Sequence, residues 1–405
     1  MAQDERAQQI ADAVRRHGAG DLAGAIAAYR ALLAGGPGEA SLHYNLGAAL
    51  QATGAVGEAI EAYEKALALD QRFVAAHYNL GVLREERGEL TEALGHFSRA
   101  AELEPGFAAA HNNRGGVLVD LGRVEDGVAA FRRAIACDPR LFLAHWNLGK
   151  YGFDGANVAE TAEHLGRAVA IEPRVGALRC HHAMALALAG REDAAKGEFA
   201  EARRLDPEQD AAEDGFAYLR AAPGRPRLFG AASALLAHAA GAAAGEGLWL
   251  EFGVFRGNSI NQIARRATGI VHGFDSFEGL PADWGGGRAK GSYSTGGALP
   301  MVEANVRLHT GLFEDTLPRF AVAHEGRVAF AHIDCDLYQS TRAVFHHLGA
   351  RMGPGTVLVF DEYLGYRGWR EHEWRAFHEF IAARGLRYEY LAFTVFGKQA
   401  AVRIA

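Results

Sequence analysis

The first half of the chain repeats its small, aromatic and proline positions every 34 residues, whereas the second half alternates short apolar runs with helical patterns. A fixed period of this length is typical of stacked helix pairs, each of which cannot bury its apolar face alone. The repeated positions are Gly47, Gly81, Gly115 and Gly149, then Gly20, Gly54, Gly88 and Gly122, then Tyr29, Tyr63, Phe97 and Phe131, and finally Pro105, Pro139, Pro173 and Pro207. The pattern predicts two antiparallel helices in each unit.

Each repeated residue type has a physical reason. A small glycine lets the two helices of a unit meet closely, a second glycine ends the first helix in a left-handed conformation, and proline stops the second helix. The pattern resembles the tetratricopeptide repeat family over residues 6–208, with six units. The first unit is degenerate because Ala13 replaces the small glycine, and the fifth has Thr161 at a small-residue position.

Four asparagines share one register, two residues before the small glycine of each unit: Asn45, Asn79, Asn113 and Asn147. In tetratricopeptide proteins that this chain resembles, such a ladder lines the concave groove and binds an extended peptide, since an amide both donates and accepts. The other interpretation is that these asparagines join neighbouring repeats. The histidines two residues earlier, beginning at His43, are predicted to pack between helices.

The period ends after Pro207, and residues 209–247 read as a helical linker. From residue 248 to 405 the alternation of strands and helices predicts a Rossmann-like α/β domain with a mostly parallel, seven-stranded sheet, in the layout of class I methyltransferases. A short turn near Gly397 predicts an antiparallel pair at the sheet edge. The expected strands are 248–254, 270–274, 306–310, 328–333, 356–360, 388–393 and 400–404.

The first expected strand ends in L-E-F-G-V-F-R-G-N, which places Glu251 before two glycines, Gly253 and Gly257. In a doubly wound sheet the ligand binds beyond the carboxyl ends of the strands, where these glycines permit a tight turn. Glu251 is placed to meet an ammonium group, and Asp275, at the end of the second strand, to accept hydrogen bonds from ribose hydroxyls. The same residues would suit S-adenosylmethionine or a nicotinamide dinucleotide.

The strings F-D-S-F-E-G-L-P and G-L-F-E-D-T-L-P, with E-F-G-V-F-R-G before them, resemble the macrocin O-methyltransferase (TylF-type) family over residues 246–403. The resemblance implies S-adenosylmethionine as the cofactor, bound by Glu251, Gly253, Gly257 and Asp275. Ser276 and Phe313 are weaker candidates near the ribose and adenine, and Phe313 is also explained as core packing.

Four carboxylates follow the fourth and fifth expected strands, in I-D-C-D-L-Y and F-D-E-Y. Adjacent parallel strands bring their carboxyl ends together, and crowded carboxylates favour a hard cation such as Mg²⁺. The family resemblance implies Asp334, Asp361 and Glu362 as magnesium ligands. Three roles remain for Asp336: a further metal ligand, the general base or the cap of the following helix. Asp334 and Asp336 are the predicted catalytic residues. The family commonly has glycine where Cys335 stands, and aspartate where Glu362 stands.

A glycine-rich segment at residues 282–299 is predicted to be a lid over the site or a solvent loop. Trp284 and Tyr293 would stack on a sugar ring, and Arg288 and Lys290 would meet an anionic group.

Composition narrows the remaining choices. A formal net charge of −7 disfavours nucleic acid as a partner, and the three cysteines form no metal or disulfide pattern. The first residues lack the apolar core of a signal peptide, and the longest alanine-rich run is too short to cross a bilayer, so we expect a cytoplasmic protein that does not insert into membranes.

The sequence therefore predicts a Mg²⁺-dependent S-adenosylmethionine O-methyltransferase. Its acceptor is a hydroxyl of a small molecule or glycan, most consistent with a sugar or glycosylated product, and its repeats dock a protein or peptide. One alternative is a protein methyltransferase whose substrate chain is presented by the repeat groove. The other is a repeat scaffold with an inactive methyltransferase domain. The oligomeric state is not predicted.

Overall fold

The computed structural model describes residues 2–34, 38–243, 245–284 and 288–405. These residues form two compact units. The first comprises residues 1–118 and 133–139, and the second comprises residues 119–132 and 140–405. The boundary between them falls inside the fourth repeat, so the second unit contains the last repeats as well as the α/β half.

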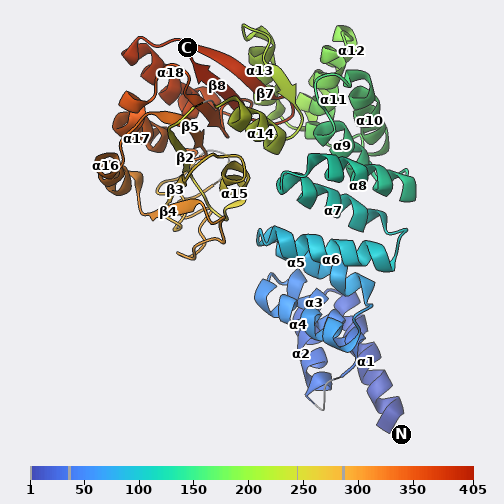
Figure 1. Ribbon diagram of the computed structural model, residues 1–405. Helices are drawn as coiled ribbons and strands as arrows, with labels where there is room; N and C mark the ends of the chain where they lie inside the picture. Colours follow the sequence, from blue (N-terminus) through green and yellow to red (C-terminus); the bar gives the residue numbers. More distant parts are fainter. Residues whose placement is uncertain (1, 35–37, 244, 285–287) are drawn as a thin grey trace. The chain divides into compact units, whose positions relative to one another are not determined.

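The described residues from 2 to 205 form twelve helices, two for each of the six predicted repeats (Figure 1). Their bounds are α1 Ala2–Gly18, α2 Leu22–Leu33, α3 Ala40–Ala52, α4 Val56–Leu69, α5 Val74–Glu86, α6 Leu90–Leu103, α7 Ala108–Asp120, α8 Val124–Cys137, α9 Phe142–Tyr151, α10 Val158–Ile171, α11 Gly176–Leu188 and α12 Glu192–Leu205. The fifth pair begins with the short helix α9 because G-F-D-G-A interrupts the pattern after Tyr151.

The repeated glycines have the roles predicted for them. A Cβ atom on Gly47 would lie 2.8 Å from the ring of Tyr63, and one on Gly81 would lie 2.8 Å from the ring of Phe97. The aromatic side chain of the second helix therefore packs directly on the glycine of the first. Gly54, which ends its helix, has a φ of 77°, a conformation that costs glycine little.

The second half of the chain forms one eight-stranded sheet in the order β1-β7-β8-β6-β5-β2-β3-β4. The strands are β1 Arg227–Phe229, β2 Leu248–Phe252, β3 Val271–Asp275, β4 Val306–Thr310, β5 Val328–Ile333, β6 Val357–Phe360, β7 Tyr388–Thr394 and β8 Ala400–Ile404. All neighbours are parallel except β8, which is antiparallel to both β6 and β7. The predicted mostly parallel α/β fold and its seven strands are confirmed.

Strand β1 is not predicted from the sequence, so the predicted position of the sheet edge is wrong. The helical linker predicted over residues 209–247 includes residues 227–229, yet these residues pair in parallel with residues 392–394 of β7. The β7–β8 hairpin is therefore covered by β1 and does not form the edge. Three residues are too few to show the alternating pattern by which a strand is recognised.

Helices cover both faces of the sheet. The remaining helices are α13 Gln209–Ala221, α14 Ala232–Ala242, α15 Asn258–Ala264, α16 Phe313–Ala323, α17 Tyr338–Leu348 and α18 Glu373–Arg384, with short 3-10 helices at Gly349–Arg351 and Trp369–Glu371. Helices α14 and α15 share one buried cluster with residues such as Trp249 and Phe330, and α16 to α18 share another with Phe252 and Phe360.

The second cluster continues into the last repeats. It includes Leu165 of α10, Phe199 of α12 and Phe216 of α13 together with Phe393 of β7. The predicted linker helix α13 is thus packed on both the repeats and the sheet. Among the described residues, no helix has the length and apolar character needed to cross a lipid bilayer.

Candidate active site

A cavity of about 730 Å³ lies at the carboxyl ends of β2, β3, β5 and β6. Strand β2 lies between β3 and β5, so the connections leave it in opposite directions, and ligands bind at such a switch point. Of the predicted cofactor and metal residues, those that line the cavity are Gly253, Asp275, Ser276, Phe313, Asp334, Asp336, Asp361 and Glu362. Its volume suits a ligand of nucleoside size.

Gly253 is required by the backbone at the end of β2. Its φ is 93°, and a Cβ atom at this position would lie 1.7 Å from the carbonyl oxygen of Asp334. The turn after β2 therefore passes directly against the end of β5. Gly257 has a φ of 81° and precedes α15, but it does not line the cavity.

Asp275 organises the loops around the cavity. Its Oδ2 accepts hydrogen bonds from the amides of Val254 (2.8 Å) and Phe255 (2.7 Å), and its Oδ1 accepts one from Phe277 (2.7 Å). Ser276 donates from its hydroxyl to the carbonyl of Gly279 at 3.3 Å. Asp275 thus fixes the first and second strand-end loops against each other at the cavity wall.

Phe313 begins α16 and lies at the wall of the cavity. Its ring meets that of Phe252 edge-on, with 5.8 Å between the ring centroids. The ring therefore packs on the core, as one interpretation has it, and contact of Phe313 with the cofactor stays a prediction.

Glu251 has a different partner from the one expected. Its side chain is fully buried, does not line the cavity, and accepts a hydrogen bond at 2.7 Å from Nδ1 of His332 on the adjacent strand β5. Burial raises the pKa of Glu251, and its second oxygen, Oε2, has no partner among the described residues. Binding of a cofactor ammonium by Glu251 stays a prediction.

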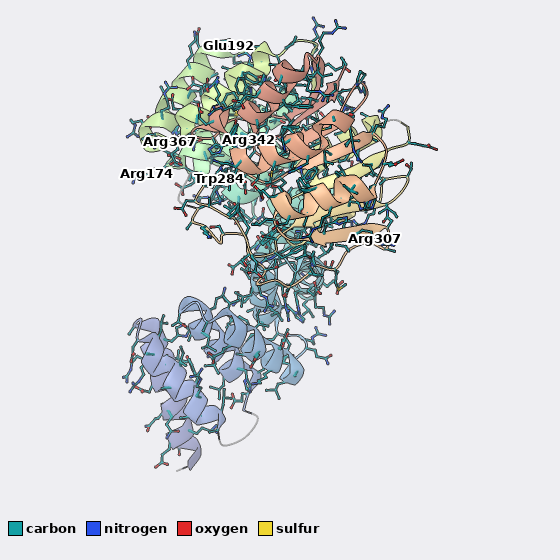
Figure 2. The ribbon with its side chains drawn as sticks, turned by 90° about the vertical axis from the view of Figure 1, so that its left-hand side faces the viewer. Arg174, Glu192, Trp284, Arg307, Arg342 and Arg367 are labelled. Carbon is teal, nitrogen blue, oxygen red and sulfur yellow. The ribbon has the colours of Figure 1, made fainter. Side chains whose placement is uncertain are left out.

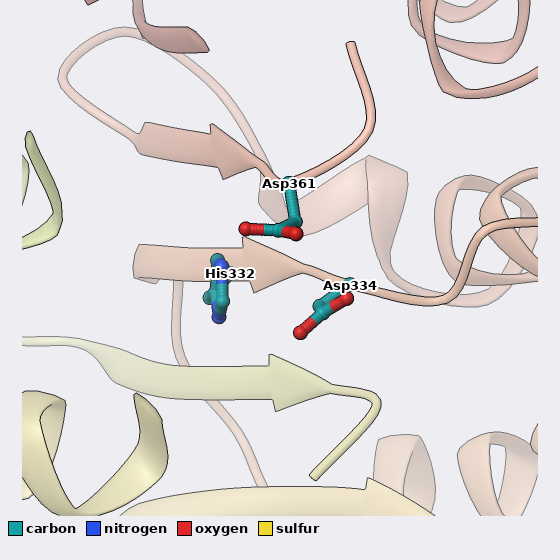
Figure 3. A group of neighbouring side chains, drawn as sticks. All are labelled: His332, Asp334 and Asp361. Carbon is teal, nitrogen blue, oxygen red and sulfur yellow. The ribbon is translucent and has the colours of Figure 1, made fainter. Parts of the chain in front are cut away.

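Asp334 and Asp361 follow β5 and β6, and with His332 they form a group whose potential ligand atoms all lie within 4.8 Å of one another (Figure 3). Burial and the neighbouring carboxylates raise the pKa of Asp334 well above its usual range. Because Glu251 bonds the Nδ1 of His332, the other ring nitrogen is left for the cluster. This group of two carboxylates and an imidazole, in which the pKa of Asp334 is raised, fits a divalent cation.

Asp336 lies two residues farther along the same loop. It has a φ of 58°, is 8% exposed, and lines the cavity. Burial, reinforced by Asp361, raises its pKa to about 6. Helix α17 begins at Tyr338 with Leu337 at its N-cap and no side-chain cap, so the interpretation of Asp336 as a helix cap is wrong.

Glu362 does not belong to the close group. Its carboxylate forms an ion pair with Lys398 (Nζ to Oε2, 2.8 Å), and Asp361 accepts a hydrogen bond from Gln399 at 3.1 Å. Burial raises the pKa of Glu362 to about 7, against the opposing effect of Lys398. His332, Lys398 and Gln399 were missed by sequence reasoning. Only the i, i+2 spacing between His332, near the end of β5, and Asp334, just after it, could have indicated His332.

The aromatic residues of the glycine-rich segment line two different cavities. Tyr293 lines the cofactor-sized cavity and is 40% exposed, whereas Trp284 is 6% exposed and faces a different cavity. Arg288 places its guanidinium 5.4 Å from the ring centroids of both aromatic residues. Lys290 donates its backbone amide to Asp283 at 2.8 Å. The part of the predicted lid at residues 285–287 lies outside the described residues.

The asparagine ladder joins successive repeats at two of its positions. Asn79 donates from Nδ2 to the hydroxyl of Tyr44 at 3.3 Å, and Asn113 donates to Tyr78 at 3.3 Å, in each case 35 residues earlier. Asn45 has Ile10 at the corresponding position. The structural interpretation therefore describes Asn79 and Asn113, and partner binding by the ladder stays a prediction.

The histidine row packs between helices, as predicted. Nδ1 of His77 lies 3.0 Å from Nδ1 of His96, and His145 meets His164 at the same distance. In each pair one ring belongs to the first helix of the repeat and the other to the second helix.

Comparison with known proteins defines the class of each half. Residues 250–363 match the family described as "Methyltransferase domain", and residues 52–86 and 78–142 match tetratricopeptide repeat families. The chain therefore carries tetratricopeptide repeats followed by a methyltransferase domain, and this prediction is confirmed.

One curated relative is the 8-demethyl-8-(2,3-dimethoxy-alpha-L-rhamnosyl)-tetracenomycin-C 4'-O-methyltransferase of Streptomyces olivaceus, which is 34% identical over 140 residues. The match covers 28% of this chain and 52% of the relative, so the chain spans about half of that protein's length.

Solved repeat structures were also found. The pilF protein of Pseudomonas aeruginosa is 18% identical, with 51% of this chain and 95% of that chain covered and a TM-score of 0.47. A thermophilic tetratricopeptide repeat protein of Thermus thermophilus is 21% identical, with 45% and 99% covered and a TM-score of 0.35.

Proposed function

We propose that this chain is an S-adenosylmethionine-dependent O-methyltransferase that uses a divalent cation, best matched by Mg²⁺, and acts on a hydroxyl of a sugar or glycosylated product. One observation carries the proposal: carboxyl groups with raised pKa values line a nucleoside-sized cavity at the strand ends of a methyltransferase domain. The relative from Streptomyces olivaceus, named as a methyltransferase of a rhamnosyl-bearing compound, supports a glycosylated acceptor.

The chain's own residues suit this reaction. The tight turn at Gly253 and the loops fixed by Asp275 leave room for the cofactor, and Phe313 borders the space for its adenine. Asp334 and Asp361 would hold the cation, and Glu362 would join them only on leaving Lys398. When bound, S-adenosylmethionine supplies the methyl group and the cation polarises the acceptor hydroxyl.

Asp336 is the residue best suited to take the acceptor's proton. It borders the cavity beside the two proposed ligands, and a pKa of about 6 leaves it mostly ionised at neutral pH yet able to accept a proton. Because Asp336 is only 8% exposed, little water competes with its charge interactions.

The test is calorimetric titration of the full chain with S-adenosylhomocysteine and, separately, with Mg²⁺. The titration with S-adenosylhomocysteine is repeated in EDTA. Binding of both is expected, and Asp334→Asn and Asp361→Asn should abolish the Mg²⁺ signal because each removes a charged oxygen ligand. Glu325→Gln removes an exposed carboxylate outside the cavity and should leave both titrations unchanged. Failure of S-adenosylhomocysteine to bind in either buffer would sink the enzyme proposal in favour of a repeat scaffold.

Activity distinguishes the acceptor class. Radiolabelled methyl transfer to glycosylated small molecules should be lost in EDTA and restored by Mg²⁺. Label that appears in protein and is insensitive to EDTA would instead support the alternative of a protein methyltransferase.

We also propose that the repeats dock a protein or peptide, as tetratricopeptide repeats suggest. Asn45 is the residue to test, because the position 35 residues earlier is not a tyrosine that could accept its hydrogen bond. Asn45→Ala should weaken capture of a partner without destabilising the fold. Equal capture by this variant would exclude the ladder as the docking surface.

A further inference from the structure

A second cavity, of about 990 Å³, lies between the last repeats and the methyltransferase domain, entirely within the second compact unit. Lys150 of α9 and His181 of α11 line it from the repeats. Glu362, residues 364–367 and residues 395–399, with Trp284, line it from the other half. Glu362 lines both this cavity and the cofactor-sized one, so the two adjoin at the acidic cluster.

The charges that line the second cavity are predominantly positive. Lys150, Arg288 and Arg367 form no ion pair with any residue that the structure describes. Lys398 is paired with Glu362, and Glu208 is the one other carboxylate among the described lining residues. A recessed site with more cations than anions attracts a negatively charged ligand.

Aromatic side chains lie among these cations. Trp284, Tyr366 and Phe396 border the cavity, and the Nζ of Lys398 lies 5.6 Å from the Trp284 ring centroid and 5.2 Å from that of Tyr366. Trp284 and Arg367 appear on the same side of the unit in Figure 2. Flat apolar rings beside charged donors suit a sugar or base that carries an anionic group.

His181 adds a neutral donor from the repeat side. Its Nδ1 accepts a hydrogen bond at 2.9 Å from the indole nitrogen of Trp146, so the proton of the neutral ring is on Nε2. Burial, with the charge of Lys150, lowers the pKa of His181 to about 3. The repeats thus contribute both a cation and a hydrogen-bond donor to the cavity.

We infer that this second cavity is the acceptor site, and that the acceptor is a sugar bearing an anionic group, phosphate or carboxylate, held by Lys150, Arg367 and Arg288 beside the acidic cluster. The inference rests on the proposed function and extends it. The last repeats would then form part of the substrate site itself, and the acceptor's hydroxyl would reach the cofactor cavity past Glu362.

The full chain is first saturated with S-adenosylhomocysteine, so that no probe occupies the cofactor cavity. It is then titrated with four sugars. The probes are glucose 1-phosphate, uridine diphosphate glucose, glucuronate and uncharged methyl glucoside. At least one anionic probe should bind about tenfold or more tightly than methyl glucoside, as expected for one charge-assisted contact. Preference for the phosphates or for glucuronate identifies the anion.

Two variants locate the binding. Lys150→Gln and Arg367→Gln should each weaken binding of the preferred anionic probe about tenfold. Neither variant should change the affinity for S-adenosylhomocysteine, and this unchanged affinity also shows that the domain is folded. Arg319→Gln removes a cation of α16 that does not line the cavity and serves as the matched control. Affinity should fall when salt is raised from about 50 to about 500 mM.

Anionic probes that bind no better than methyl glucoside, or equally well to both cavity variants, would overturn the inference. If S-adenosylhomocysteine binds in those experiments, the proposed methyltransferase function stands and only the acceptor site is wrong. If S-adenosylhomocysteine does not bind at all, the proposed function itself has failed.

Discussion

Replacing Gly253 by alanine is the sharpest test of the architecture at the strand ends. The added Cβ would lie 1.7 Å from the Asp334 carbonyl oxygen, and real Cβ contacts essentially never fall below 3.0 Å. The backbone of β2 or β5 must therefore move by at least 1.3 Å, the difference between 3.0 and 1.7 Å. The atom in the way belongs to the main chain, so a side-chain rotation gives no relief.

The cost has two parts. A residue other than glycine at a φ of 93° costs about 1–2 kcal/mol, and insertion of a methyl group into a packed site costs about 1–3 kcal/mol. We expect Gly253→Ala to lower the free energy of unfolding by about 2–5 kcal/mol and to displace Asp334 from Asp361. S-adenosylhomocysteine affinity should fall with it.

Urea unfolding followed by tryptophan fluorescence measures the first effect, because four of the five tryptophans lie after residue 248. Gly269→Ala is the matched control: nothing lies within 4 Å of its Cβ position, and the exposed site should change stability by less than about 0.5 kcal/mol. A Gly253→Ala protein that unfolds at the parent's urea midpoint and binds the cofactor analogue equally well would refute the reasoning.

The repeats give two further predictions. Burial and the neighbouring His77 lower the pKa of His96 to about 4, so the unfolded state binds more protons below about pH 6.5. Stability of the first unit should therefore fall as pH drops from about 6.5 to about 4, and thermal melts of His96→Gln should show a shallower decline. Asn79→Ala removes a donor from Tyr44 and should cost about 1 kcal/mol in urea unfolding, whereas Asn45→Ala should cost less; equal losses would contradict the repeat-to-repeat role.

The parts of the fold that the sequence predicts are those fixed by local or periodic patterns. The 34-residue period determines the helix pairs because each repeat contacts mainly its neighbours. Strands β4, β5 and β8 were bounded correctly because apolar runs and turn residues mark their ends. Strand β1 was missed because its pairing with β7 joins residues more than 160 positions apart, and three residues carry no period.

The sequence predicts which strand ends form the site, but it does not predict the contacts between individual side chains. Asp334, Asp336 and Asp361 converge because parallel strands end together, which is a consequence of topology. The hydrogen bond of Glu251 to His332 and the ion pair of Glu362 with Lys398 depend on which side chains face each other after folding. Such contacts have no local signature, and the same is true of the cavity beside Lys150.

The segment predicted as a linker shows why the last repeats and the methyltransferase domain are one structure around the site. Helix α13 approaches the loop that follows Glu362 so closely that a Cβ on Gly215 would lie 2.5 Å from Cα of Gly365. Asp214 accepts a hydrogen bond from the indole of Trp369 at 3.0 Å, and the hydroxyl of Tyr218 meets that of Tyr390 at 2.5 Å. These contacts fix the loop between the two cavities from the repeat side. Helix α13, which packs on the last repeats, therefore contributes to the geometry of the methyltransferase site.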